Sequence, residues 1–208
     1  MKIRVVKKGK EKMEFVLDDV TPAFANALRR LMISKVLVLA VDWLDVHDNS
    51  SVLFDEIVAH RLGLIPLKFS PERFNMQDEC KCGGKGCSLC QAIFTIDKTG
   101  PCVVYSSDMK SNSDVKPLFP TFPIVELLEN QSLKLEATAR LGVGENHAKF
   151  QAANAAYQYY PETQAENPAG FLFRVETISG LEPSYIISKA AELLEQEAEE
   201  FKKELKSI

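Results

Sequence analysis

The sequence predicts an α+β protein, and three patterns along the chain carry this prediction. Two segments in the first third have the caps and apolar spacing of short helices. Residues 133–141 alternate apolar and polar side chains without exception, as in a strand with one buried face. The last segment repeats apolar residues at alternating steps of four and three, as in a long amphipathic helix.

The beginning of the chain predicts a hairpin followed by a helix. Residues 2–6 and 12–18 have the alternation of two paired strands. Thr21 and Pro22 mark the start of the helix, because a hydroxyl cap followed by proline is a frequent helix start. The helix is expected to extend to about Lys35 and to present Phe24, Leu28 and Leu31 along one side.

A second helix is predicted after an apolar strand at 36–46. Ser50 and Ser51 offer its cap, and Gly63 is expected just past its end, in the C′ position. We expect its buried stripe to consist of Phe54, Ile57, Val58 and Leu62. Further strands are expected at 91–97, 102–106, 133–141, 150–160 and 170–177.

The terminal helix is predicted to begin at Pro183 and to run for about 22 residues. Its apolar residues form a heptad seam: Ile187, Ala191, Leu194, Ala198, Phe201 and Leu205. This seam could lie on the protein's own sheet, but a spacing of 3.5 residues more often faces another helix. Pairing with a partner protein would bury roughly 2,000 Å² or more.

Composition and charge exclude several classes of protein. Apolar residues make up 46% and charged residues 26% of the 208 residues, as in folded soluble proteins. A net charge of −4 disfavours strong, direct binding of DNA or RNA. The longest apolar run, 36–41, is too short to cross a membrane, and the first residues lack the core of a signal peptide. We therefore expect a cytoplasmic protein.

Four of the five cysteines lie close together in the order C-x-C-x4-C-x2-C: Cys80, Cys82, Cys87 and Cys90. Their clustering, without a secretion signal, favours metal ligation over disulfides. Three glycines between them would allow the sharp turns that a metal site needs. Four thiolates around Zn²⁺ leave no open position, so such a zinc would be structural. An iron–sulfur cluster and unliganded or redox-active thiols remain as alternatives.

The residues predict no catalytic constellation. His47, His60 and His147 are isolated from one another, and no nucleophile stands at a suitable spacing from a base. Arg29 and Arg30 on the first helix are either a solvated pair or a docking contact. A self-standing metal or thiol redox protein built on the four cysteines is the alternative function, and it would require an open coordination position or a perturbed thiol.

Four segments resemble the D subunit of archaeal RNA polymerase, the counterpart of the third-largest subunit of eukaryotic RNA polymerase II and of the bacterial alpha amino-terminal domain. These segments are PAFANALRRLMIS (22–34), LFDEIVAHRLGLIPL (53–67), ARLGVGENHAKFQAANAAYQYYP (139–161) and FLFRVETISGLEP (171–183) with the helix that follows. They run in the order found in that family and cover most of the chain.

The resemblance implies a dimerisation domain made of residues 1–45 and 169–208, interrupted by a mostly β insertion at 46–168 that carries the cysteine loop. It implies a heterodimer with the smaller subunit L through the first and terminal helices. This pair would then assemble with subunits N and P and with the second-largest catalytic subunit, near Arg29 and Arg30. The cysteine loop would hold zinc, as in eukaryotic relatives.

The resemblance also implies that this chain is an enzyme only as part of DNA-directed RNA polymerase, a nucleotidyltransferase, and meets DNA only through the complex. The chain departs from the family pattern in one place. Many archaeal relatives carry a ferredoxin-like, cysteine-rich segment with an iron–sulfur cluster before the final strand. Residues 162–169 contain no cysteine, so that cluster is not expected here.

Overall fold

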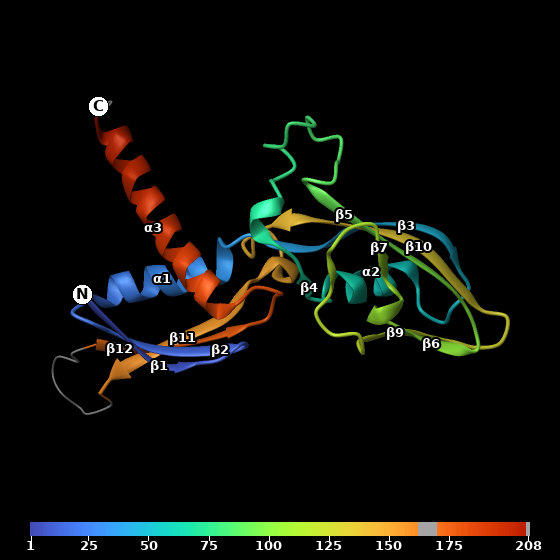
Figure 1. Cartoon of the computed structure of the whole chain (residues 1–208), viewed down its shortest axis with the longest axis horizontal. Coiled ribbons are helices and arrows are strands. Elements are labelled where there is room, and N and C mark those ends of the chain that lie inside the picture. Colours follow the sequence, from blue (N-terminus) through green and yellow to red (C-terminus); the bar gives the residue numbers. More distant parts are fainter. Residues whose placement is uncertain (162–169, 207–208) are drawn as a thin grey trace. The chain divides into compact units, whose positions relative to one another are not determined.

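The computed structural model describes residues 1–161 and 170–206 and divides into two compact units. Unit 1 is built from residues 1–36 and 143–208, and unit 2 from residues 37–142 (Figure 1). Both units contain antiparallel sheets and helices, which confirms the predicted α+β class. Residues 162–169, where the sequence predicts that no iron–sulfur cluster is bound, lie outside the described residues.

The two units are divided at 36/37 and 142/143, whereas the resemblance implies domain bounds at 45/46 and 168/169, which stay a prediction. The strand Val38–Asn49 pairs with a strand of unit 2, so unit 2 begins before residue 46. The strand Ala153–Tyr160 pairs with a strand of unit 1, so unit 2 ends well before residue 168. Strand pairing, which the sequence does not specify, sets both bounds.

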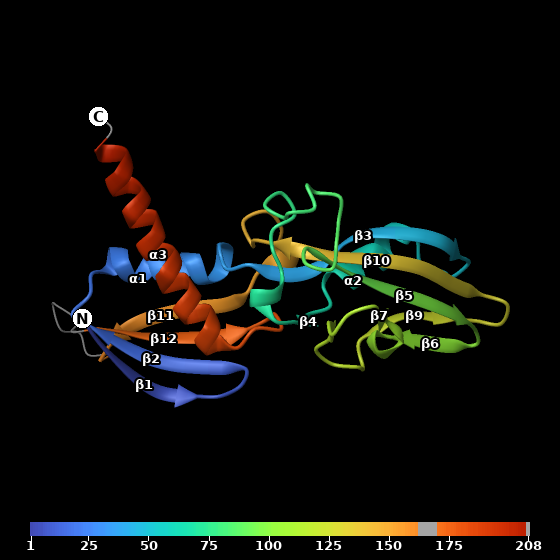
Figure 2. The ribbon, with the colours of Figure 1, turned by 45° about the horizontal axis from the view of Figure 1, so that its top comes forward.

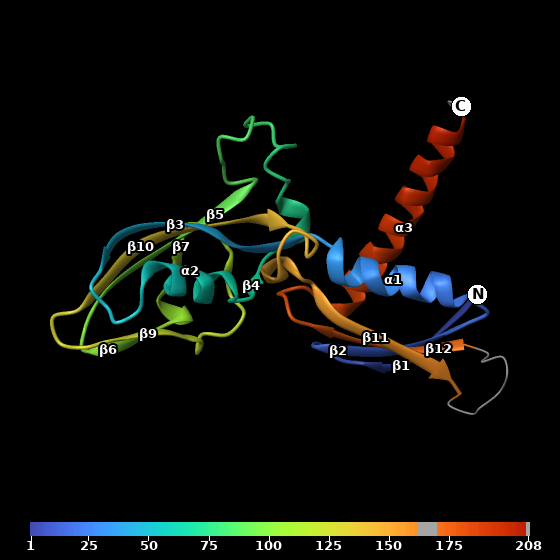
Figure 3. The ribbon, with the colours of Figure 1, turned by 180° about the vertical axis from the view of Figure 1, so that it is seen from behind.

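Unit 1 is a four-stranded antiparallel sheet with two helices. In sheet order its strands are β1 (Lys2–Lys8), β2 (Lys12–Asp18), β12 (Gly170–Thr177) and β11 (Ala153–Tyr160). Helix α1 (Pro22–Ser34) packs on β11 and on helix α3 (Pro183–Leu205). Figures 1, 2 and 3 show α1 over one face of the sheet, while the carboxyl half of α3 extends away from it. A short 3₁₀ turn, η3 (Ala148–Phe150), precedes β11.

Aromatic packing forms the centre of unit 1. Phe15 and Phe173 are cross-strand neighbours, and their rings stack with centroids 5.0 Å apart. Tyr157 and Phe171 meet edge to face at 5.3 Å. Each such pair adds roughly 0.5–1.5 kcal/mol beyond the burial of its area. At the start of α1, the Thr21 hydroxyl accepts a hydrogen bond from the Phe24 N–H at 3.2 Å, which confirms the predicted cap.

Unit 2 contains a larger sheet, two small strand pairs and one helix. The strands of the larger sheet, in order, are β3 (Val38–Asn49), β10 (Ser132–Gly142), β5 (Gln91–Thr99) and β7 (Lys110–Ser111). The smaller pairs are β4 (Leu67–Lys68) with β8 (Lys116–Pro117), and β6 (Cys102–Tyr105) with β9 (Pro123–Leu127). The remaining elements are α2 (Asp55–Gly63) and the turns η1 (Pro71–Arg73) and η2 (Ser106–Asp108).

The predicted alternation of residues 133–141 is confirmed in β10. Leu133, Leu135, Ala137 and Ala139 are buried, while the side chains between them face away from the core. Because β10 lies between β3 and β5, its buried face supplies the middle of the core of unit 2.

The predicted cap and end of α2 are wrong. The helix begins at Asp55, and its N-cap is Phe54, which has no capping side chain. The Ser51 hydroxyl instead donates to the Asn49 side chain at the end of β3, at 2.6 Å. Gly63 is the last helical residue, and Leu64 takes the C-cap position with a negative φ of −89°.

The predicted buried stripe of α2 is half right. Val58 and Leu62 are 1% and 0% exposed, whereas Ile57 is 45% and Phe54 78% exposed. Phe54 precedes the helix in extended backbone, so the helical period does not place its side chain. Ile57 lies about 100° around the helix from Val58, toward solvent.

Candidate functional site: metal centre and helix faces

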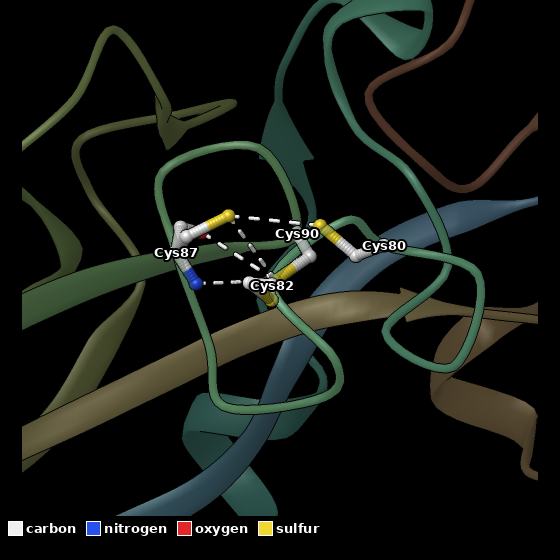
Figure 4. A group of neighbouring side chains, drawn as sticks. All are labelled: Cys80, Cys82, Cys87 and Cys90. Atoms are coloured by element: carbon white, nitrogen blue, oxygen red, sulfur yellow. Dashed lines mark hydrogen bonds between the residues drawn. The ribbon is translucent and has the colours of Figure 1, made fainter.

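The four clustered cysteines converge in unit 2 (Figure 4). Their sulfur atoms all lie within 4.8 Å of one another, with Cys80 Sγ 3.6 Å from Cys87 Sγ and Cys82 Sγ 3.7 Å from Cys90 Sγ. Four sulfurs placed 2.3 Å from a tetrahedral Zn²⁺ would be about 3.8 Å apart. The spacing of these thiols therefore fits a single tetrahedral metal ion.

Two turns bring the sulfurs together. In the first turn, the Gly83 N–H donates to the Cys80 carbonyl at 2.9 Å. Gly83, Gly84 and Gly86 all have a positive φ, between 64° and 87°, which glycine adopts without strain. In the second turn, the Cys87 N–H donates to Cys90 Sγ at 3.2 Å, the kind of bond that favours a thiolate. The local sequence therefore preforms both halves of the site.

The thiols ionise unequally. Burial opposes ionisation of Cys82, but hydrogen bonds from the Cys80 thiol and the Gly86 N–H outweigh it and lower the Cys82 pKa to about 7. Burial raises the pKa of Cys90 to about 12. Four thiolates this close together require a cation to offset their charge. The cluster could thus bind a metal ion, and with four protein ligands it leaves no coordination position for a substrate.

The fifth cysteine and the histidines lie apart from this cluster. Cys102 on β6 is partly buried and packs against the core of unit 2, as expected for a core residue. His47 and His60 are exposed, and His147 Nδ1 accepts from the Lys149 N–H at 3.1 Å. Within the described ranges, the four cysteines form the one group of side chains with metal-ligand spacing.

Sequence reasoning missed Gln77, which contacts the cysteine turn from outside. Its Nε2 atom donates to the Gly84 carbonyl at 2.8 Å. A glutamine three residues before the first cysteine offers no ligand chemistry, so no spacing rule identifies it. Only the folded arrangement places it against the turn.

The terminal helix is covered by unit 1 over its first half. Pro183, Ile186 and Ala190 are buried, and the seam residues Ile187 and Leu194 are partly buried. The other seam residues, Ala191, Ala198, Phe201 and Leu205, are exposed. Phe201 is 65% and Leu205 54% exposed, so the far half of the seam lies open on this chain.

The first helix turns two of its five predicted interface residues inward. Leu28 and Leu31 are 4% and 6% exposed, so they belong to the core of unit 1. Phe24 is partly buried, and Arg30 is exposed. Arg29 donates to Asn26 Oδ1 at 2.9 Å, within its own helix. No described helix is both long and apolar enough to cross a membrane.

Comparison with known proteins gives one matching family and several curated relatives. The family described as "RNA polymerase Rpb3/RpoA insert domain" matches residues 46–159. DNA-directed RNA polymerase subunit Rpo3 of Archaeoglobus fulgidus is 46% identical over 162 residues, which cover 77% of this chain and 61% of that protein. The Rpo3 proteins of Methanothermobacter thermautotrophicus and Pyrococcus horikoshii are 43% and 42% identical, over 79% and 77% of this chain and 64% and 60% of their own lengths. The chain thus matches about three fifths of the length of these relatives.

Proposed function

Because the chain belongs to the family of the RNA polymerase Rpb3/RpoA insert domain, we propose that it is a non-catalytic assembly subunit of an archaeal DNA-directed RNA polymerase. In this role it contributes to DNA-templated transcription by holding other subunits together. The polymerising chemistry belongs to the large subunits, so this chain takes part in nucleotidyl transfer only within the complex. It meets DNA indirectly, through its partners.

The observation that carries this proposal is the open half of the α3 seam. Phe201 and Leu205 expose most of their apolar surface at heptad spacing. Exposed apolar ridges of this kind mark protein interaction sites in soluble proteins. A second helix laid along the ridge would cover both side chains, and the smaller subunit L is the partner that we propose to supply it.

The proposed interface is narrower than the sequence alone indicated. It consists of the seam residues of α3 and the outward side chains of α1: Phe24, Arg30, Ile187, Ala191, Leu194, Ala198, Phe201 and Leu205. Leu28 and Leu31 are left out because the core of unit 1 covers them. Arg29 and Arg30 are proposed to lie near the second-largest catalytic subunit, and the heterodimer to recruit subunits N and P.

We propose that the four cysteines hold one structural zinc ion. The closed set of four thiol ligands and the sulfur spacing support zinc, while an iron–sulfur cluster at the same residues is the alternative. When bound, the ion would tie the glycine turn to β5. Cys80, Cys82, Cys87 and Cys90 would supply all of its ligands, so the metal would stabilise unit 2 and perform no chemistry.

Co-expression tests the assembly role. The chain is produced with and without subunit L, and the mass and metal content of the products are measured. We expect a stable one-to-one heterodimer that contains about one zinc per copy of this chain. A chain that stays monomeric in the presence of subunit L contradicts the assembly role. Thiol-dependent turnover by that monomer would favour the redox protein instead.

A further inference from the structure

We propose that Gln77 is a positioning residue for the metal site. Together with Arg140 and Asp42 it forms a chain of polar contacts, here called the Gln77 bracket, that holds the glycine turn of the cysteine loop against the sheet of unit 2. The bracket slows the release of the metal ion without contacting it. This inference rests on the metal site proposed above.

Both polar atoms of the Gln77 side-chain amide form hydrogen bonds. Its Nε2 atom donates to the Gly84 carbonyl at 2.8 Å, and its Oε1 atom accepts from Arg140 Nη1 at 3.3 Å. The bond to Gly84 is partly buried, which lowers the competition from water, whereas the bond to Arg140 is exposed. The side chain therefore connects the turn to a residue on the sheet.

The sheet end of the bracket is firmly anchored. Arg140 lies on β10, and its Nη2 atom is 2.6 Å from Asp42 Oδ2 on β3. The Asp42 side chain is 19% exposed and the Arg140 side chain 49%, so only the carboxylate side of this ion pair is shielded from water. Because β3 and β10 are neighbours in the sheet, the guanidinium group is fixed by two strands.

The turn end of the bracket is the part of the loop that most needs support. Gly84 lies in the segment between Cys82 and Cys87, where three glycines adopt a positive φ. Ordering a residue costs about 1–2 kcal/mol of backbone entropy, and glycine loses the most. A bond to the Gly84 carbonyl restricts this segment before the metal arrives, so the ligands on either side keep their spacing.

A second side chain, Gln91 on β5, packs against the glycine turn from the side of the sheet. Gln91, the cross-strand partner of Arg140, packs so closely on Gly86 that an added Cβ at Gly86 would lie 2.3 Å from Gln91 Oε1. Gln77 and Gln91 thus contact the same turn at Gly84 and Gly86. Loss of an outer hydrogen bond made directly to a metal ligand typically weakens metal binding by about 10–100-fold. Gln77 bonds the chain between two ligands and not a ligand itself, so we expect an effect at the low end of this range.

The test uses Gln77→Glu, which keeps the size of the side chain and the acceptor for Arg140 but removes the donor to Gly84. Gln131→Glu is the matched control, because Gln131 lies in the same unit and uses its Oε1 atom to accept from the Leu128 N–H at 2.8 Å. Arg140→Gln is the second variant, and it removes the anchor while leaving Gln77 in place. Each is made in the full chain, purified with subunit L.

Three quantities are measured: the rate of zinc release to excess chelator, the absorption spectrum of the Co²⁺-substituted protein, and the thermal midpoint after metal removal. We expect Gln77→Glu to release zinc about tenfold faster than the unaltered chain, and Arg140→Gln to shift the rate in the same direction. The Co²⁺ spectrum of both variants should remain that of four thiolate ligands. The metal-free midpoint of Gln77→Glu should not change, whereas Arg140→Gln also breaks the ion pair with Asp42 and should lower the midpoint with and without metal. Gln131→Glu should match the unaltered chain throughout.

Two results would overturn the inference alone. One is zinc release from Gln77→Glu within about twofold of the unaltered, zinc-loaded chain, against the larger effect expected of such bonds. The other is an equal loss of stability of Gln77→Glu with and without metal, which would make its bond to Gly84 an ordinary contact of the fold. An unaltered chain that binds no zinc would instead overturn the proposed metal site and the bracket with it.

Discussion

At the scale of single residues, the cysteine cluster and the ion pair of Lys98 with Asp108 make unit 2 sensitive to pH. The Cys82 pKa of about 7 lies well below that of Cys90, at about 12, although the two sulfurs are 3.7 Å apart. A bound divalent ion displaces the thiol protons from both residues, so metal binding releases protons and weakens as the pH falls.

Replacing Cys80 and Cys82 together by serine should abolish metal binding. Two of the four ligands are lost, and serine hydroxyls are poor ligands for Zn²⁺ at neutral pH. We expect a zinc content near zero and a lower thermal midpoint for unit 2, with the one-to-one complex with subunit L retained. Metal analysis and native mass measurement check both parts. Loss of pairing in this variant would mean that the two units do not act separately.

Asp108 provides a pH-dependent contribution to the stability of unit 2. Burial alone would raise its pKa, but the hydrogen bond from Lys98 Nζ at 2.7 Å and the bond from the Tyr105 N–H at 2.9 Å hold the pKa below its ordinary value. A depressed pKa stabilises the fold above the unfolded value of about 3.9, and this contribution is lost as the pH falls through the folded pKa.

Asp108→Asn should therefore lower the free energy of unfolding by about 1 kcal/mol at pH 7. The difference from the unaltered chain should shrink as the pH falls below about 4 and the native carboxylate is protonated. Because the Lys98 side chain is 41% exposed, high salt should also reduce this difference in unfolding free energy. Urea titrations at pH 7 and below about pH 4 measure this difference. A difference that grew toward low pH would show that the pKa is raised instead.

At the scale of elements, the open half of α3 is the feature on which the proposed assembly role depends. Phe201→Asp should abolish pairing with subunit L, because it places a charge in the middle of the apolar ridge. The stability of this chain alone should change by less than about 0.5 kcal/mol, since the side chain is 65% exposed. Gel filtration and thermal unfolding check the two expectations.

Lys203→Asp serves as the control for this substitution. It introduces the same side chain two residues further on, away from the seam. Pairing that survives Phe201→Asp but fails in Lys203→Asp would place the interface on the other face of α3.

The sequence predicted correctly those elements in which buried side chains recur at one regular spacing or in which the interaction is local. In β10, every second side chain meets the core, so alternation alone identifies the strand and its buried face. In α1, the hydroxyl cap at Thr21 depends only on residues within one turn. The stripe of α2 was predicted less well, because Phe54 lies outside the helix and the helix is only nine residues long.

In the candidate site, too, only the features formed by residues close together in sequence could be predicted. The cysteine spacing and the intervening glycines indicated the metal cluster, because ligand and turn lie within eleven residues of sequence from Cys80 to Cys90. The Gln77 bracket could not be predicted, because Arg140 reaches Gln77 across a sequence separation of 63 residues. The inward position of Leu28 was also beyond sequence reasoning, since a helix with one apolar side can turn it toward its own sheet or toward a partner.

At the scale of the whole molecule, the two units differ in how they are built from the chain. All strands of unit 2 come from one continuous segment, 37–142, so this segment should fold and bind zinc when it is produced alone. We expect a cooperative thermal transition, about one zinc per fragment and no pairing with subunit L, because α1 and α3 are absent. Calorimetry and metal analysis test this. A fragment that stays unfolded in the presence of zinc would contradict it.

In the sequence, unit 2 lies between the two segments of unit 1, so the ribosome completes unit 2 before the second segment of unit 1. A ribosome emits β1, β2 and α1 first, yet β2 gains its sheet neighbour β12 only after all of unit 2 has left the exit tunnel. During elongation, Phe15 lacks the Phe173 ring on which it later stacks. The nascent hairpin therefore leaves Phe15 without its stacking partner until β12 emerges, and a truncated product cannot present α3 to a partner.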